Sequence, residues 1–221
     1  MIYLIIIAVL LFIWWIRPVS VHRADQVAYA ADGTLFEIRD GHLIIDNKPV
    51  QSSRKFRAVA PWTKHKWYWL DEDGAVWFFT HCIKHGLPWP VREISIYDDL
   101  LWALDCHGTV WCRGTEGPAS WTRCLDDARS IHANGWAMAT AVNNKGQAMN
   151  TINAGRTWQQ VATYPRPLHR LIIGPHQSIV AIFKDNSMTI NGTIVPGRWR
   201  HATVCEKKCA AVDEIGRVHI F

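Results

Sequence analysis

A ten-residue pattern recurs along this chain and constrains its fold more than any other feature. The pattern is an apolar strand, an acidic turn with glycine and a second apolar strand. Its clearest copies are residues 68–77 and 102–111, and weaker copies continue after residue 26. Glycine or asparagine supplies the positive φ that tight hairpin turns need, so each copy predicts a β-hairpin.

Six units emerge when the copies are aligned on the turn residue. The turn residues are Gly33, Gly74, Gly108, Gly146, Asn186 and Gly216. The interval from one turn residue to the next lies within or just below the range of propeller blades. The predicted fold class is therefore all-β, a β-propeller of five to six small blades with six favoured, preceded by one N-terminal transmembrane helix.

The two ends of the chain offer a way to close the ring. The chain stops on residues 217–221, a predicted strand without an outer partner, and residues 20–28 could supply one. Such pairing removes the free edges that an open stack would expose. We expect residues 18–26 to be a linker or ring-closing strand and residues 27–221 to be the propeller. In the second unit we expect strands at 57–62, 67–70, 76–80 and 88–94.

The N-terminal segment predicts a membrane anchor. Residues 2–16 carry no charge and would span roughly 23 Å as a helix, short of the roughly 30 Å hydrocarbon core. Trp14 and Trp15 suit the membrane interface, and Pro18 ends the helix. We expect residues 1–17 to form a transmembrane signal-anchor helix. A cleaved signal peptide and a buried core helix are the alternatives.

Two opposing signals bear on the orientation of the anchored propeller in the membrane. Arg17, His22 and Arg23 follow the apolar run, which by the positive-inside rule places the propeller in the cytoplasm. Small tethered propellers are commonly exported, and an even number of cysteines is compatible with disulfides. The expected localisation is the inner (plasma) membrane, single-pass, with a periplasmic propeller; the cytoplasmic orientation stays open.

Tryptophan is abundant and follows the repeat. Trp89, Trp121, Trp158 and Trp199 each follow a turn residue at nearly the same interval along the chain. One residue type at one phase of a repeat indicates one structural role. We expect most of these side chains to pack in the core between blades.

Residues 151–158 read Thr-Ile-Asn-Ala-Gly-Arg-Thr-Trp. This segment resembles the Asp-box, the BNR repeat of sialidase-like propellers, with Asn153 in place of the aspartate. The resemblance implies a structural turn between the outer strands of a blade. Catalytic sialidases use three arginines, a Tyr-Glu pair and an acidic aspartate, and that pattern is missing around Arg54 and Arg57. We therefore expect a non-catalytic member and no enzyme activity.

The cysteines and histidines give no metal signature. Cys112 and Cys124 fall in neighbouring predicted strands, and Cys205 and Cys209 flank a predicted tight turn, so these four could form disulfides. Six cysteines allow fifteen connectivities, and free buried thiols are an equal alternative. The spacing of the set His81, Cys82, His85, Cys106 and His107 matches no standard zinc site. We expect no metal and no cofactor.

The charge distribution and the absence of known motifs exclude several classes of binding partner. The net charge is +5, but lysine and arginine occur in small groups, so no nucleic-acid partner is expected. No phosphate-binding loop or nucleophile motif occurs, so no small-molecule substrate is expected. Mixed aromatic and cationic loops resemble binding hot spots. The predicted binding residues are Trp62, Lys64, His65, Lys66, Trp67, Tyr164, Arg166 and Arg170.

These observations predict a membrane-anchored protein-binding module of the bacterial cell envelope. Its role would be assembly, secretion accessory or toxin immunity, and the sequence does not choose among them. The alternative is a glycan-binding or degenerate glycan-hydrolase-like propeller. That alternative needs tryptophans exposed on one face and arginines with carboxylates in the central cavity.

Overall fold

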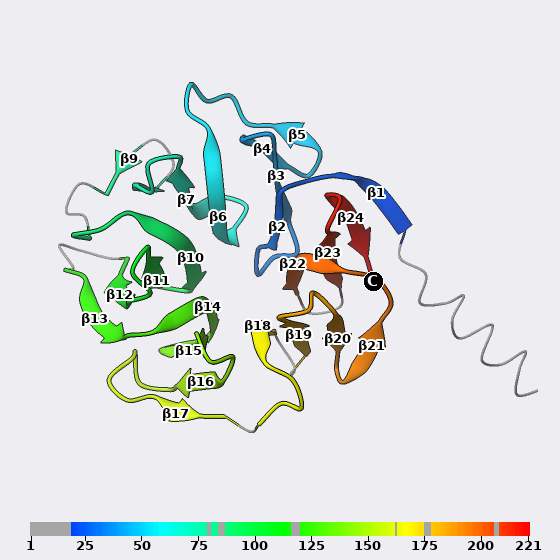
Figure 1. Ribbon diagram of the computed structural model, residues 1–221. Coiled ribbons are helices and arrows are strands. Elements are labelled where there is room, and N and C mark those ends of the chain that lie inside the picture. Colours follow the sequence, from blue (N-terminus) through cyan, green and yellow to red (C-terminus); the bar gives the residue numbers. More distant parts are fainter. Residues whose placement is uncertain are drawn as a thin grey trace, which may run out of the picture.

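Six four-stranded antiparallel sheets surround a common axis (Figure 1). The computed structural model describes residues 19–78, 81–83, 87–115, 120–161, 163–174, 178–205 and 208–221. Each sheet is one blade, and its four strands follow one another in order from the axis to the periphery. The prediction of a six-bladed all-β propeller is confirmed.

The four strand positions recur in every blade. The innermost strands are β2 (Gln26–Tyr29), β6 (Phe56–Thr63), β10 (Val91–Tyr97), β14 (Ala128–Gly135), β18 (Leu168–Ile173) and β22 (Trp199–Val204). The second strands are β3 (Leu35–Arg39), β7 (Lys66–Asp71), β11 (Leu100–Asp105), β15 (Met138–Asn143), β19 (Ile179–Phe183) and β23 (Cys209–Asp213). The third strands are β4 (His42–Ile45), β8 (Val76–Phe78), β12 (Val110–Gly114), β16 (Ala148–Thr151), β20 (Met188–Ile190) and β24 (Arg217–Ile220). The outer strands are β5 (Lys48–Pro49), β9 (His81–Cys82), β13 (Thr122–Leu125), β17 (Gln159–Gln160), β21 (Thr193–Val195) and β1 (Val19–Arg23).

The sixth blade joins both ends of the described chain. β1 pairs with β24, with Val19 opposite Ile220 and Ser20 opposite His219. The N-terminal strand therefore supplies the outer edge of the blade that the C-terminal strands build, and the ring has no gap at this point. Residues 26–28, expected to take part in this closure, instead begin the first blade as part of β2.

The predicted fold class needs one correction. The residues that the structure describes contain strands and turns but no helix, and none of their segments could cross a membrane as a helix. The expected transmembrane helix before the propeller therefore has no support. Residues 1–17, on which that prediction depended, lie outside the described residues.

A hydrogen bond at the same place joins each blade to the next. The carbonyl of the turn residue between the second and third strands accepts a bond from the N–H at the start of the next inner strand. We call these the seam hydrogen bonds. The six pairs, acceptor first, are Gly41–Phe56 (2.8 Å), Gly74–Val91 (3.1 Å), Gly108–Ala128 (2.8 Å), Gly146–Leu168 (3.0 Å), Asn186–Trp199 (2.7 Å) and Gly216–Ala24 (2.6 Å).

The seam corrects one unit of the predicted repeat. In the first blade Gly41 makes the seam hydrogen bond, whereas Gly33 lies in the turn between the first and second strands, at the opposite end of the blade. Both follow an aspartate and have positive φ (78° and 81°). The local sequence of a hairpin turn is the same at either end of a blade, so the pattern alone could not separate them.

In the second and third blades, an aspartate holds the seam turn through hydrogen bonds. In Asp105 one carboxylate oxygen accepts the N–H groups of His107 and Thr109, each at 2.9 Å, and the other accepts Trp111 Nε1 at 2.9 Å. Asp71 holds Trp77 Nε1 at the same distance. The acidic turn therefore caps its own backbone and fixes the aromatic ring on the following strand.

Three of the four spaced tryptophans, Trp121, Trp158 and Trp199, pack on apolar clusters between blades as predicted, and Trp89 does not. Trp199 starts β22 and is 2% exposed, whereas Trp89, in the connection before β10, is 51% exposed. Trp121 and Trp158 precede the outer strands β13 and β17 and are half-buried. The predicted strand 88–94 is likewise divided: Val91 begins the inner strand of the next blade, and β9 is the outer strand of the second.

The Asp-box-like segment forms a turn where the resemblance implies one. Thr151 ends β16 and Trp158 precedes β17. Asn153 Oδ1 accepts the N–H of Thr157 at 3.0 Å, and Thr151 Oγ1 accepts the N–H of Gly155 at 3.1 Å. This turn joins the third and outer strands of the fourth blade. Membership of the BNR family stays a prediction.

The four cysteines considered as possible disulfide partners are free thiols in this structure, which is the alternative that the sequence left open. Cys112 and Cys124 lie on neighbouring strands with their sulfur atoms 3.2 Å apart. Cys205 and Cys209 are buried. The sequence therefore located one close pair of sulfurs correctly, while the structure holds them unbonded.

Candidate functional site

The two ends of the blades make two different faces. We call the turn face the end that carries the seam turns and the connections from each outer strand to the next blade. The hairpin face is the other end, where turns join the first and second strands. Antiparallel strands put these two sets of turns at opposite ends of every blade.

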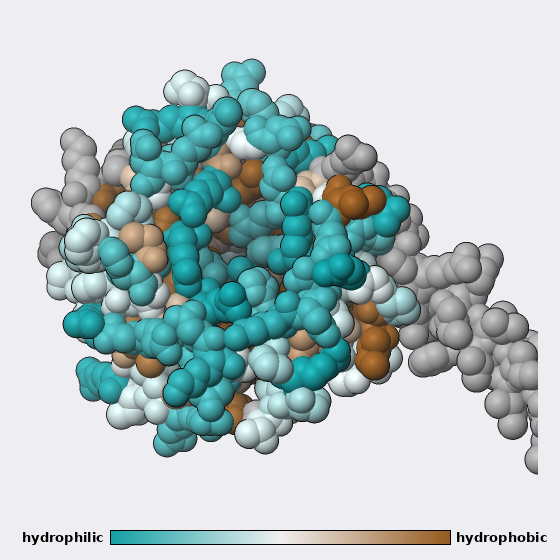
Figure 2. Space-filling view, viewed as in Figure 1, coloured by the Kyte–Doolittle hydropathy of each residue, from teal (hydrophilic) through white to brown (hydrophobic). Residues whose placement is uncertain are grey.

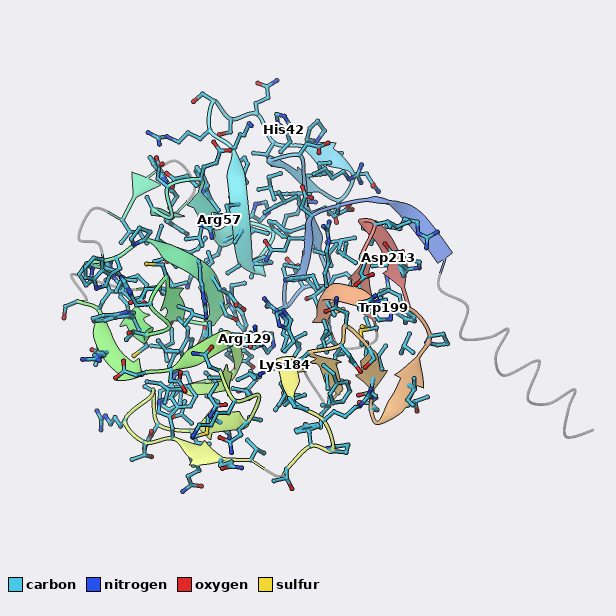
Figure 3. All side chains as sticks on the ribbon, in the orientation of Figure 1. His42, Arg57, Arg129, Lys184, Trp199 and Asp213 are labelled. Carbon is cyan, nitrogen blue, oxygen red and sulfur yellow. The ribbon has the colours of Figure 1, made fainter. Side chains whose placement is uncertain are left out.

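A β-bulge interrupts five of the six inner strands at the same position. The register skips one residue directly after the seam residue in β6, β10, β14, β18 and β22. Every skipped residue is basic: Arg57, Arg92, Arg129, His169 and Arg200. A bulge re-aims a side chain, and these five residues, the bulge ring, surround the axis at the turn face. In Figure 3, Arg57 lies on β6, and Arg129 lies near the centre of the ring with Lys184.

Two arginines of the bulge ring bind the next blade. Arg92 donates from one Nη to the carbonyls of Ala128 (2.8 Å) and Arg129 (2.9 Å). Arg200 donates to the carbonyl of Ala24 at 2.9 Å and contacts Asp25 at 3.4 Å. These two guanidiniums therefore reinforce seams.

Two others have no such engagement. Within the described part of the chain, the side chains of Arg57 and Arg129 have no hydrogen-bond or ion-pair partner, and Arg57 is exposed. Their positive charge is available to a ligand at the mouth of the channel.

Below the ring, polar groups line the channel. Arg170 of β18 forms an ion pair with Glu93 of β10 at 2.6 Å, and both side chains are largely buried. These strands belong to the third and fifth blades, so the pair passes in front of β14. Figure 2 shows a central hollow lined mainly by hydrophilic residues.

The histidines of the channel are held neutral. Burial, and then the charge of Arg170, lower the pKa of His132 to about 4. The pKa of His169 is also lowered to about 4, by burial and by Arg170 and Arg129. The pKa of His201 lies well below its ordinary value for the same first two reasons. At neutral pH the positive charge of the channel therefore resides on its arginines.

The pKa of Glu93 is shifted upward, whereas those of the channel histidines are shifted downward. Burial raises the pKa of its carboxyl group, and the nearby charge of Arg170 only partly offsets that effect. A carboxylate in this channel therefore depends on a close guanidinium partner for its charged form.

The predicted binding loop around residues 62–67 lies on the hairpin face. Lys64 pairs with Asp46 at 3.0 Å and Lys66 pairs with Asp99 at 2.5 Å. Trp62 packs on the ring of Tyr97, with centroids 4.7 Å apart.

The other two predicted binding residues of this loop, Trp67 and His65, differ in how exposed their side chains are. Trp67 is 6% exposed and packs in the core with Phe36 and Phe56. His65 is exposed at the tip of the turn. The cations and aromatic rings of this loop thus mostly serve the blade itself.

The second predicted loop lies on the turn face but is also engaged. Arg166 pairs with Asp185 at 3.1 Å and lies over the ring of Phe183. Tyr164 packs against the apolar cluster between the fourth and fifth blades. Of the eight predicted binding residues, Arg170 is the one that the structure places in the channel.

No group of three or more metal-ligating side chains forms among the described residues. His85 and the side chains of His81 and Cys82 lie outside that part of the chain. The structure thus identifies no metal centre there.

A regular spacing in the sequence could have revealed the bulge ring. Each basic bulge residue precedes the turn residue of its own blade by nearly the same interval. The pairs are Arg57 with Gly74, Arg92 with Gly108, Arg129 with Gly146, His169 with Asn186 and Arg200 with Gly216. In the first blade Asp25 stands at the corresponding position before Gly41, and β2 has no register shift. A search at a fixed interval before each turn residue would have found the bulge ring, whereas a search for local clusters of charge does not.

Comparisons with known proteins support the fold. No protein-family model matches the chain, and no curated protein matches it. Among solved structures, human WBSCR16 is similar with a TM-score of 0.62 at 10% identity, covering 90% of this chain and 76% of that one. The β-propeller domain of Cps50 (Swd1) from Myceliophteria thermophila also has a TM-score of 0.62 at 10% identity, covering 93% and 98%. Yeast RCC1 (Prp20), solved with Kap60 bound, has a TM-score of 0.61 at 9% identity, covering 91% and 68%. At these identities the likeness shows a propeller fold and nothing finer.

Proposed function

We propose that this protein is a protein-binding module that holds a partner over its turn face, with the bulge ring at the centre of the contact. The observation that carries this proposal is the repeated bulge, which places an arginine at the same point of four blades and leaves two of them, Arg57 and Arg129, without a partner among the described residues. Bulges are features that re-aim side chains beside functional sites. A rigid frame with variable loops on its faces suits binding more than catalysis.

The solved propellers offer support of a general kind. Yeast RCC1, whose fold is similar, is bound to the protein Kap60 in its structure. We carry over from it the use of a propeller as an interaction platform, and not the partner. The role in the bacterial cell envelope and the periplasmic placement stay predictions from the sequence.

Affinity capture with charge-matched variants tests the proposal. Full-length protein is used as bait in an extract of its own cells. Baits are the wild type, Arg57→Ala/Arg129→Ala on the turn face and Lys64→Ala/Lys66→Ala on the hairpin face. Each variant loses two positive charges. We expect the wild type and the Lys64/Lys66 variant to recover the same stoichiometric protein and the Arg57/Arg129 variant to lose it. Equal recovery by both variants, or no stoichiometric protein with any bait, would refute the proposal.

One observation bears on the glycan-binding alternative. Arg170 with Glu93 supplies the arginine and carboxylate that this alternative requires in the channel. The exposed tryptophans do not form a platform, however, because Trp89 lies on the turn face and Trp136, 76% exposed, lies in the turn between β14 and β15 on the hairpin face. Glycan binding therefore has half of its required features, and protein binding is the function that we favour.

A further inference from the structure

We infer that the channel below the bulge ring receives a carboxylate of the partner, and that Glu93 occupies the place of this carboxylate in the free protein. This inference rests on the proposed protein-binding function and names the chemistry of the segment that enters. The ligand group is an acidic side chain or a chain-terminal carboxylate on a peptide segment.

The first support is the arrangement of Arg170. Its Nη1 donates to Glu93 at 2.6 Å, joining the third and fifth blades past the fourth. Arginine presents donors in a planar fork that can hold a carboxylate through two bonds. Here one Nη is engaged, and Nε is buried without a hydrogen-bond partner among the described residues. The fork is therefore only partly satisfied by the carboxylate that the protein itself provides.

The second support is a further unsatisfied atom. His201 Nδ1 is also buried without a partner in the described part of the chain. Its strand, β22, belongs to the blade that follows the blade of Arg170. A buried polar atom without a hydrogen bond costs on the order of 1–3 kcal/mol. A polar ligand group or water would relieve these costs, and Arg170 Nε, which can only donate, requires an acceptor.

The third support is where the unbalanced charge lies. Around the rim of the turn face, four cations are paired with acids: Lys55 with Glu72, Arg123 with Asp126, Arg166 with Asp185 and Arg198 with Glu214. Lys145, in the seam turn of the fourth blade, has no acid partner among the described residues. At the centre, Arg57 and Arg129 are unpaired among the residues that the structure describes. A basic centre inside a rim whose cations are mostly paired suits a single carboxylate better than a polyanion such as nucleic acid, which would need a continuous basic track.

The histidines add a measurable signature. Burial lowers the pKa of His132, His169 and His201, and the positive charge of Arg170 lowers all three further. Arg129, Arg92 and Lys184 also lower the pKa of His169, and Arg200 also lowers that of His201. A bound carboxylate would offset this charge and raise those pKa values. Binding would then take up protons, and affinity would rise as the solution becomes mildly acidic.

Fluorescence anisotropy on the full-length protein tests the inference. Three labelled peptides are compared: an N-acetylated glutamate tripeptide amide, the matching glutamine tripeptide amide and an N-acetylated alanine tripeptide with a free carboxyl end. The first and third separate a side-chain source from a terminal one. We expect at least one of these two to bind, and the glutamine peptide to bind about tenfold more weakly or not at all.

Three variants make the test specific. Glu93→Gln removes the competing internal carboxylate at nearly constant shape, so we expect tighter binding of the carboxylate peptide, about fivefold. Glu93→Gln/Arg170→Gln is neutral in net charge change and should abolish binding. Lys64→Ala/Lys66→Ala should bind as the wild type does. Thermal unfolding of each variant verifies that it is folded.

The possible results separate this inference from the proposed function. Equal affinity for glutamate and glutamine peptides, weaker binding by Glu93→Gln, or tighter binding of a single-stranded DNA oligonucleotide would overturn the channel inference. If capture of the protein partner survives Glu93→Gln/Arg170→Gln while it is lost in Arg57→Ala/Arg129→Ala, the proposed function stands and the channel inference fails. If the peptides bind as expected but capture recovers no protein, the proposed function fails instead.

Discussion

The turn face and the hairpin face both carry glycine turns and cationic side chains, but these residues have different structural roles on the two faces. On the turn face, Gly74 approaches the next blade so closely that an added Cβ would lie 2.7 Å from the carbonyl oxygen of Val91; at Gly33, on the hairpin face, nothing among the described residues lies within 4 Å. The lysines of the hairpin loop are paired with acids, whereas Arg57 and Arg129 of the turn face have no acid partner in the described chain. Position in the blade, and not residue type, therefore decides which of these residues join blades and which are left without an acid partner in the described chain.

The largest expected difference between the faces is in glycine substitution. Alanine at Gly33 or Gly74 must adopt positive φ, which costs about 1 kcal/mol. Gly74→Ala also pushes the backbone of Val91 and disrupts a seam, so we expect a loss of about 3 kcal/mol or more. Urea unfolding of both variants measures the two values. Equal losses would show that the seam does not distinguish the faces.

The next contrast concerns two turn aspartates. Asp105 is fully buried and accepts three hydrogen bonds, including that of Trp111. Asp32 is exposed on the hairpin face and accepts the N–H groups of Thr34 and Lys64. We expect Asp105→Ala to cost about 3 kcal/mol and Asp32→Ala about 1 kcal/mol, since buried orphan donors cost more than solvated ones. Comparable denaturation midpoints for the two variants would contradict this ranking.

The channel should make stability fall in mild acid. The pKa of His132 is about 4 in the folded protein and about 6.5 in an unfolded chain. Between these values the unfolded chain binds more protons, so stability is full above about pH 6.5 and falls toward pH 4, by at most about 1.4 kcal/mol per pH unit for this group. His132→Gln should show a shallower slope when urea unfolding is measured across this range. An unchanged slope would mean that His132 titrates alike in both states.

The smallest effect is expected from the ion pairs of the hairpin face. Lys64 is half exposed in its pair with Asp46, and Lys66 is more covered in its pair with Asp99. Exposed pairs contribute about 0.2–1 kcal/mol. Lys64→Ala should therefore shift the unfolding midpoint only slightly, and Lys66→Ala slightly more. A loss above about 2 kcal/mol for either would place this loop among the structural elements of the frame.

Much of the frame was predictable from the sequence, because the repeat is strong. The turns at Gly74, Gly108 and Gly146 predicted both the fold class and six blades. The blade boundaries were harder. Trp89 stands at the right spacing for a core residue, yet it lies in a connection on the surface, because the outer strand of its blade is very short.

The candidate site was not predictable from local composition. The loop at residues 62–67 is denser in cations and aromatic rings than the bulge ring, whose members are spread over five strands. Only the fold brings Arg57, Arg92 and Arg129 around one axis, and only the pairing with acids neutralises the loop. Arg170 was singled out for its own loop and reached the channel because it lies within β18.

Photo-crosslinking at two positions of one blade tests most directly whether the partner sits on the turn face. His65 and Glu72 are both exposed and stand at opposite ends of β7, on the hairpin face and the turn face respectively. A photoreactive amino acid is placed at one or the other in full-length protein within its own cells. We expect the Glu72 position to crosslink one discrete protein and the His65 position to give none. A discrete product from His65 alone, or the same product from both, would contradict a partner held over the turn face.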